Sequence, residues 1–239
     1  IIEIMYADFC LVAADQLFNQ IAKVRHMFGG TSTVPLIVRI RAAGGHGYGS
    51  QHSMDPSGLF ALWPGRRGIV PTTPFDYIGL FNSAINCDDP VVIIETQTLF
   101  QEEGQVPAND LDYCIPFGKA RIVRPGSACT ILASGHMAQH SIAAAEQCGI
   151  DAEVIDPRTV DPDSLDWQTI GDSVKRTNRL LVAEQTARGP SLGAHIVQEG
   201  QERLFDYLDH QILRVTGSQS APVVSRILEQ AALAGVEEV

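Results

Sequence analysis

The chain has 239 residues, 45% of them hydrophobic, which is enough for one large domain or for two ordinary domains with separate cores. Its formal net charge is −11, and it contains no run of lysine or arginine, so nucleic acids and anionic membranes are not expected as partners. The five cysteines form no C-x-x-C pair and the longest apolar stretches are of strand length, which argues against a disulfide framework, a zinc site and a membrane span.

The first residues of the chain, 1–9, already have the apolar pattern of a buried strand. Chain ends are usually polar and loosely held, so this pattern suggests that further residues precede Ile1 in the native protein. Apolar residues then recur at three- and four-residue spacing over 13–30, and the segment finishes with two glycines. This spacing predicts an amphipathic helix with a glycine stop.

Strands and helices are then predicted in alternation. Nearly continuous runs rich in valine and isoleucine, typical of strands covered on both faces, occupy residues 35–40, 90–95, 128–134, 151–156 and 179–185. The helical pattern begins near Pro56 and recurs over residues 75–89, 137–149 and 191–209. Such alternation is typical of parallel sheets with helical crossovers and predicts an α/β protein.

Residues 100–127 interrupt this alternation, since they contain prolines, glycines and acidic residues and only a short predicted strand near 119–124. We therefore predict a first domain over residues 1–105, a connection over 106–124, and a second complete α/β domain over 125–239. Parallel or mixed sheets are expected in both domains.

A glycine-rich loop, GGHGYGSQHS at residues 44–53, lies between a predicted strand and a predicted helix. Ligands of open α/β sheets bind where strand carboxyl ends meet such loops, and glycine lets the backbone approach a ligand or a neighbouring chain closely. The third glycine and the distal acid of a dinucleotide-binding loop are missing in register, and no G-K-[ST] of a P-loop follows. The loop is therefore predicted to be a close-approach loop of another kind.

An ordered set of motifs resembles one family, the β subunits of thiamine-diphosphate-dependent 2-oxo acid dehydrogenases, which act on pyruvate, branched-chain 2-oxo acids or acetoin. The motifs lie at residues 3–9, 15–30, 47–53, 71–95, 106–120 and 153–159. The resemblance implies a transketolase-like pyrimidine-binding domain followed by a transketolase C-terminal domain. It also implies that the amino-terminal third of the subunit, with the glutamate that activates the cofactor, lies upstream of this sequence.

The resemblance assigns roles to single residues. It places Met5 and Phe9 against the aminopyrimidine ring of thiamine diphosphate, where a thioether and an aromatic face suit a flat heteroaromatic ring. His52 matches a histidine implied to act in acid/base catalysis or orientation during acyl transfer to lipoyl, and His46 is a candidate channel residue. Without the resemblance, the favoured interpretation is that Met5 and Phe9 are core residues at a strand end and that His52 is a hydrogen-bonding residue at a helix start.

The turn AINCDDP, residues 84–90, resembles the family's potassium-binding turn. The implied ligands are Leu36, Ile37, Ala84, Cys87 and Asp89. Hard cations prefer oxygen, so Cys87 could contribute only its carbonyl, and the family often has aspartate at that position. A turn capped by Asp88 or Asp89 without any metal is the alternative.

The magnesium signal of thiamine enzymes, G-D-G followed by an asparagine, is reduced here to Gly171-Asp172. The chain is therefore predicted not to hold the diphosphate alone. The resemblance implies an α subunit that supplies magnesium and completes the site in an α2β2 heterotetramer, a lipoyl acyltransferase core as a further partner, and a 2-oxo acid or acetoin as substrate. The five cysteines, an odd number without a C-x-x-C pair, predict a reducing compartment, which is the cytoplasm, or the mitochondrial matrix in a eukaryote.

Two other functions are open at this point, namely the C-terminal half of a transketolase or deoxyxylulose-phosphate synthase, and a catalytically silent scaffolding subunit. Sugar-phosphate enzymes would be expected to have more basic residues near the loops. His136 and His140 lack the glutamate of a zinc-protease motif and are interpreted as a solvated helix start. Ser191 is interpreted as a helix start rather than a nucleophile, and the charged residues Arg39, Asp8 and Asp15 as structural pairs.

Overall fold

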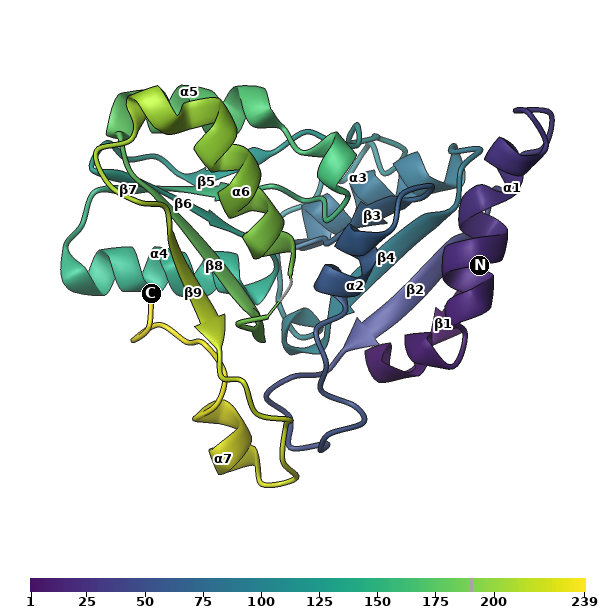
Figure 1. The fold of residues 1–239 in the computed structure, drawn as a ribbon, viewed down its shortest axis with the longest axis horizontal. Helices are drawn as coiled ribbons and strands as arrows, with labels where there is room; N and C mark the ends of the chain where they lie inside the picture. Colours follow the sequence, from purple (N-terminus) through teal and green to yellow (C-terminus); the bar gives the residue numbers. More distant parts are fainter. Residues whose placement is uncertain (190) are drawn as a thin grey trace.

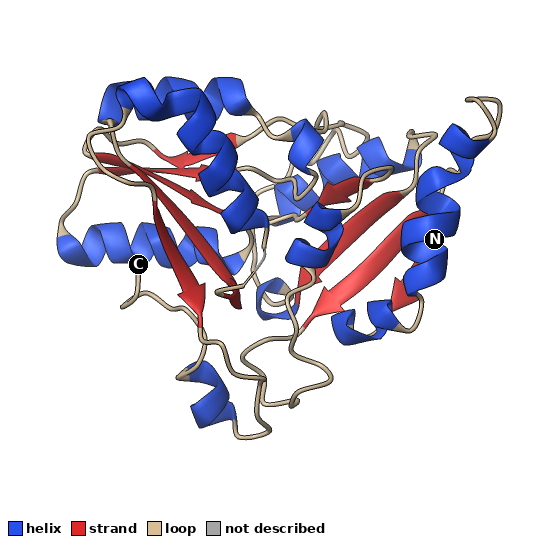
Figure 2. Ribbon diagram, in the orientation of Figure 1, coloured by secondary structure: helices blue, strands red, loops and turns tan. Residues whose placement is uncertain are grey.

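Two β-sheets, one built from residues 2–96 and one from residues 121–217, form the framework of the chain in a computed structural model that describes residues 1–189 and 191–239 (Figure 1). Helices alternate with strands in both halves (Figure 2). The predicted α/β class with two sheets is therefore confirmed. The last residues of the predicted connection, 121–124, form a strand of the second sheet.

The first sheet is entirely parallel and has the strand order β1-β2-β4-β3. Its strands are β1 (Ile2–Ile4), β2 (Ile37–Ala42), β3 (Arg67–Ile69) and β4 (Val91–Thr96). The central strands β2 and β4 are buried, as their continuous valine and isoleucine runs predict. The prediction of a buried strand at the start of the chain is wrong, because β1 lies at the sheet edge and leaves the Ile2 side chain 46% exposed.

The helices of the first half follow the predicted order. A short 3-10 helix (Ala7–Leu11) follows β1, and the helix predicted over 13–30 is a π-helical segment (Asp15–Gln20) that continues as α1 (Ile21–Met27). The later helices are α2 (Ser57–Leu62) and α3 (Pro74–Ile85). Helix α3 has a strong start signal, since the Thr73 side chain accepts a hydrogen bond from the Asp76 backbone N–H and proline is the first helical residue.

The second sheet is mixed, with the strand order β5-β7-β6-β8-β9 and only β5 antiparallel to its neighbour. Its strands are β5 (Arg121–Arg124), β6 (Cys129–Ala133), β7 (Ala152–Asp156), β8 (Leu180–Ala187) and β9 (Leu213–Gly217). Its helices are α4 (His136–Cys148), α5 (Trp167–Thr177), α6 (Leu192–Leu204) and α7 (Arg226–Gln230). Helix α4 covers one face of the sheet and α5 and α6 cover the other (Figure 2).

The sequence did not predict β3, β9, α5 or α7. Strand β3 has three residues and α7 has five, too few for a periodic pattern to emerge. Strand β9 is only partly buried and lacks a continuous apolar run. Helix α5 is strongly amphipathic, and a start signal was available, because the Asp166 carboxylate accepts a hydrogen bond from the Thr169 backbone N–H.

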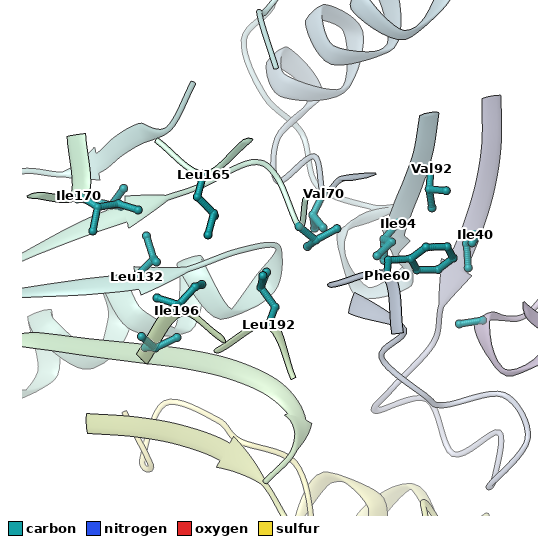
Figure 3. Close-up of a cluster of buried hydrophobic side chains, with 14 of the residues drawn as sticks. Ile40, Phe60, Val70, Val92, Ile94, Leu132, Leu165, Ile170, Leu192 and Ile196 are labelled. Carbon is teal, nitrogen blue, oxygen red and sulfur yellow. The ribbon is translucent and has the colours of Figure 1, made fainter. Parts of the chain in front are cut away.

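The two sheets are joined by backbone hydrogen bonds and by one hydrophobic cluster. The Val70 N–H donates to the Arg158 carbonyl at 3.0 Å, and the Val160 N–H donates to the Gly68 carbonyl at 2.9 Å. Buried side chains from both halves pack into the same cluster (Figure 3). The cluster includes Ile40, Phe60, Val70, Val92, Ile94, Leu132, Leu165, Ile170, Leu192 and Ile196. Among the described residues, no helix is long and apolar enough to cross a membrane.

Candidate functional site

An aromatic cluster lies at the carboxyl ends of β1 and β2. Tyr6 and Phe9 come directly after β1, and the glycine loop after β2 brings Tyr48 and His52 to the same place. The His52 ring lies edge-on to Tyr6 and to Phe9, with ring centroids 5.1 and 5.5 Å apart. Two of the residues to which the sequence assigned roles, Phe9 and His52, are therefore in direct contact.

The neighbouring Met5 and Phe9 side chains are exposed to solvent. Met5 is 53% exposed and Phe9 is 37% exposed, so neither is a core residue and that alternative is wrong. The Arg41 guanidinium lies 3.8 Å from the Met5 sulfur, and the same group stacks over the Tyr6 ring at 5.7 Å. A thioether and aromatic faces are thus presented at one sheet edge, an arrangement that can receive a flat apolar ring.

The alternative interpretation of His52 as a helix-start residue is also wrong. Helix α2 begins only at Ser57, whose N–H donates to the Asp55 carboxylate at 2.9 Å. The His52 backbone N–H instead donates to the Gly49 carbonyl at 3.2 Å, within the glycine loop. Its half-buried ring is therefore oriented by the loop and by the two aromatic rings beside it.

Unpaired polar atoms accompany the aromatic cluster. His46 stacks on Tyr48 at 5.6 Å, and its buried Nε2 has no hydrogen-bond partner among the described residues. The same holds for the Oε1 atom of Gln97, whose amide nitrogen donates to the Tyr48 hydroxyl at 3.1 Å. Buried polar atoms are nearly always paired, so these two atoms are free to form hydrogen bonds with water, a ligand or a partner chain.

The bare backbone of the glycine loop contacts the chain's own C-terminal segment. Gly47 and Gly49 have φ values of +75° and +84°, which L-amino acids with a side chain rarely adopt. A Cβ atom at Gly47 would lie 3.0 Å from the Val224 carbonyl oxygen, and one at Gly49 would lie 3.0 Å from a Val224 methyl group. Close approach is thus required, as the sequence indicated, and the neighbours are Val224 at both glycines and Arg226 at Gly47.

The turn predicted to bind potassium offers backbone oxygens but no free carboxylate from Asp89. The Asp89 carboxylate accepts a hydrogen bond from Arg25 at 2.7 Å and lies 3.9 Å from Arg67, so it does not fit the role of a cation ligand. The Ala84 carbonyl accepts from the Cys87 N–H at 3.3 Å. Potassium binding stays a prediction that rests on the carbonyls of Leu36, Ala84 and Cys87.

Two interpretations of residues set aside on sequence grounds are tested by the structure. Ser191 caps helix α6, since its side chain accepts a hydrogen bond from the Ala194 N–H, which confirms the helix-start interpretation. The solvated interpretation is wrong for His136, which is buried, and burial lowers its pKa to about 4. Its ring lies 5.1 Å from that of His140, but no group of three or more His, Cys, Asp or Glu side chains among the described residues could hold a metal.

The three charged residues that were predicted to form structural pairs differ in the groups that they contact. Arg39 forms a bidentate ion pair with Glu95 at 2.7 and 3.0 Å, as a structural pair should. Asp15 instead accepts hydrogen bonds from side-chain amides, and Asp8 accepts one from the Met54 backbone N–H at 3.2 Å. The prediction of charge pairing is therefore confirmed for Arg39 and wrong for the two aspartates, which cap backbone or amide groups.

Several residues at the site were missed from the sequence. They are Tyr6, Arg41, Tyr48 and Gln97. Tyr6 lies between Met5 and Phe9 in the first motif, and Tyr48 stands between two glycines in the loop, so an aromatic residue inside each motif was an available signal. Arg41 lies near the carboxyl end of β2, and Gln97 directly follows the adjacent parallel strand β4, a pairing that only the structure shows.

Two family models match the chain, and together they cover most of it. Residues 1–102 match the transketolase pyrimidine-binding domain, and residues 118–239 match the transketolase C-terminal domain. In the structure, the first range contains β1–β4 with the aromatic cluster, and the second contains β5–β9.

Named relatives agree with these models. The chain is 38% identical over 232 residues to the acetoin:2,6-dichlorophenolindophenol oxidoreductase subunit beta of Bacillus subtilis, covering 96% of this chain and 67% of the relative. It is 37% identical to the 2-oxoisovalerate dehydrogenase subunit beta of Pseudomonas aeruginosa, with coverages of 91% and 66%. It is 35% identical to the pyruvate dehydrogenase E1 component subunit beta of Rhizobium meliloti, with coverages of 100% and 52%. The chain thus spans between about half and two thirds of these relatives' lengths.

A solved structure with the same fold is a split-gene transketolase, described as an inactive beta4 tetramer. It superposes with a TM-score of 0.74 and covers 99% of this chain and 71% of that one. Its sequence identity is 18%, so this match supports the fold alone.

Proposed function

This chain belongs to the β subunits of thiamine-diphosphate-dependent 2-oxo acid dehydrogenases, and we propose that it forms the aminopyrimidine side of a cofactor site that an α subunit completes. The proposed reaction is the oxidative decarboxylation of a 2-oxo acid, or the cleavage of acetoin, with transfer of the acyl group to lipoyl. The observation that carries the proposal is the exposed Met5 and Phe9 pair beside His52, at the carboxyl ends of parallel strands.

The roles proposed for these side chains follow from their contacts. Met5 and Phe9 present apolar surface on which a flat heteroaromatic ring can pack while water is kept out. The His52 ring contacts Tyr6 and Phe9, which restrict its orientations, and its imidazole nitrogens can donate or accept a hydrogen bond or a proton at the bound carbonyl. Thiamine diphosphate, when bound, would supply a nucleophilic carbon and an electron-accepting ring for the reaction.

The missing part of the site is assigned to the partner. We propose that the α subunit holds magnesium and the diphosphate, because the sequence lacks the G-D-G motif and the described residues contain no metal-binding cluster. The proposed assembly is α2β2, docked on a lipoyl acyltransferase core. The compartment we propose is the bacterial cytoplasm or the mitochondrial matrix, and the proposed domain ranges are residues 1–105 and 125–239.

Cofactor titration tests this proposal. The polypeptide that carries this sequence is co-expressed with its α subunit and titrated with thiamine diphosphate in the presence of magnesium, and binding is followed by calorimetry. We expect saturable binding by the complex and none by either subunit alone. Binding by the β chain alone, or none by the complex, would contradict the shared site.

Variants test the assigned residues. Phe9→Ala should weaken cofactor binding by about tenfold, since it removes about 1–2 kcal/mol of aromatic contact. Phe205→Ala, which changes an exposed aromatic residue of the other half, is the matched control. His52→Ala should leave cofactor affinity unchanged and impair acyl transfer to lipoyl. Full transfer by the His52 variant would refute its role.

The two other functions raised from the sequence receive less support. The transketolase match in the solved structures concerns the fold alone, whereas relatives at 33–38% identity are named as acetoin oxidoreductase or 2-oxo acid dehydrogenase β subunits. A silent scaffolding subunit would give no cofactor-dependent turnover when assembled with its α subunit. The titration and a single-turnover assay of the same complex therefore separate the silent alternative from the proposal.

A further inference from the structure

The C-terminal segment, residues 218–233, crosses from the second half of the chain to the glycine loop of the first half (Figure 1). Three hydrogen bonds hold the two together. The Gly47 N–H donates to the Glu229 carboxylate at 2.5 Å, the Ser50 hydroxyl donates to the Pro222 carbonyl at 2.6 Å, and the Gln230 amide donates to the Gly45 carbonyl at 3.4 Å. Two segments that are far apart in the sequence are therefore connected at the loop that carries His52.

Glu229 is the unusual member of this contact. Its side chain is only 1% exposed, and no lysine, arginine or histidine of the described residues forms a salt bridge with it. One carboxylate oxygen accepts the Gly47 N–H, and the other, Oε1, is buried without a hydrogen-bond partner. A buried carboxylate without a cation destabilises the fold relative to an apolar side chain of similar volume, so stability alone does not explain a glutamate at this position.

The Gly47 peptide connects Glu229 to the aromatic cluster. Gly47 adopts φ +75°, and its neighbours in the chain are His46 and Tyr48, which stack on each other. The Tyr48 ring lies 5.6 Å from Tyr6, which is the ring that lies edge-on to His52. The contact with Glu229 therefore restrains the backbone between His46 and Tyr48, and ring contacts connect Tyr48 through Tyr6 to His52.

We propose that Glu229 is a positioning residue, which orients the glycine loop so that Tyr48 and His52 lie correctly at the cofactor edge. The part of this inference that concerns catalysis rests on the proposed function, whereas the part that concerns loop order does not. Charge is not required for the contact, because a neutral side chain with an acceptor oxygen can receive the same N–H. The acceptor is required, because without it the half-buried Gly47 N–H loses its partner within the chain.

Three variants of the assembled α–β complex test the proposal. Glu229→Met keeps the volume and removes the acceptor, Glu229→Gln keeps an acceptor without the charge, and Glu237→Gln removes an exposed carboxylate nearby as the control. Amide hydrogen exchange of residues 44–53 is measured by mass spectrometry. We expect exchange about tenfold faster in the methionine variant, and near wild-type exchange in the other two.

The same variants are then assayed for activity and cofactor affinity. In the methionine variant kcat should fall about tenfold or more, because small misplacement of catalytic groups reduces rate steeply, while the Kd for thiamine diphosphate changes less than about threefold. Glu229→Gln should restore most of kcat. If the methionine variant does not assemble, Ser50→Ala removes the adjacent hydrogen bond to the Pro222 carbonyl and should also speed loop exchange, to a smaller extent.

Each outcome decides one part of the inference. Unchanged loop exchange in Glu229→Met overturns the positioning of the loop, whatever the activity. Faster exchange with unchanged kcat overturns the catalytic consequence and leaves the proposed function intact. An inactive wild-type complex refutes the proposed function instead, and the exchange comparison then still shows whether Glu229 orders the loop.

Discussion

Asp156, the last residue of β7, should make the unfolding free energy of the protein depend on pH. Its carboxyl group is fully buried, and burial raises its pKa from 3.8 to about 7, although a hydrogen bond from the Arg158 N–H at 2.8 Å opposes that rise. A group with a raised folded-state pKa stabilises the fold at low pH and loses that contribution as pH rises to the folded pKa. The wild-type protein should therefore become less stable between pH 5 and pH 7 on account of Asp156.

The size of the effect follows from the same pKa. Between pH 5 and pH 7 the unfolded carboxyl is already ionised, so each pH unit removes about 1.4 kcal/mol and the total is roughly 3 kcal/mol. Asp156→Asn keeps the shape and an acceptor for the Arg158 N–H but cannot ionise. The unfolding free energy of Asp156→Asn minus that of wild type should therefore rise by roughly 3 kcal/mol from pH 5 to pH 8.

Urea unfolding followed by circular dichroism at pH 5, 6, 7 and 8 measures this difference. Comparison with wild type at each pH removes the contributions of other titrating groups. Asp110→Asn, which changes an exposed aspartate, is the control and should give a constant difference across the series. A wild-type minus Asp156→Asn difference that stays constant within about 0.5 kcal/mol would refute the assignment of a raised pKa to Asp156.

Three further predictions concern stability. Asp76→Ala removes the buried partner of Arg158, 2.5 Å away, and should lower the unfolding free energy by about 3–5 kcal/mol in urea titrations, whereas the exposed Asp151→Ala should change it by less than about 1 kcal/mol. The unfolding free energy of wild type should fall by roughly 3 kcal/mol as the pH falls from 6.5 to about 4, because the buried His136 imidazole resists protonation while the unfolded one does not. His136→Met should remove this fall in urea titrations. A flat wild-type profile would contradict the prediction. Gly126→Ala would place a Cβ atom 2.3 Å from the backbone of β7 and should cost at least about 1–3 kcal/mol, visible as a lower Tm; an unchanged Tm would disprove the close approach.

The sequence determined the elements whose local pattern is strong. Continuous valine and isoleucine runs predicted β2 and β4, and the glycine pair at residues 29–30 marks where α1 ends. The same local signals could not show that β1 lies at a sheet edge, because an edge is defined by which strands pair and not by the strand's own residues. Short elements such as β3 were missed for the opposite reason, since three residues contain no period.

The candidate site also has features that the sequence predicts and features that only the fold decides. The motifs around Met5 and in the glycine loop were recognisable in the sequence, because each one combines characteristic residue types within a few consecutive positions. Which groups they meet depended on the fold. The Asp89 carboxylate is held by Arg25, and Gly47 approaches Glu229, 182 positions later in the chain. Contacts between distant segments have no local signature, so only the tertiary structure decided them.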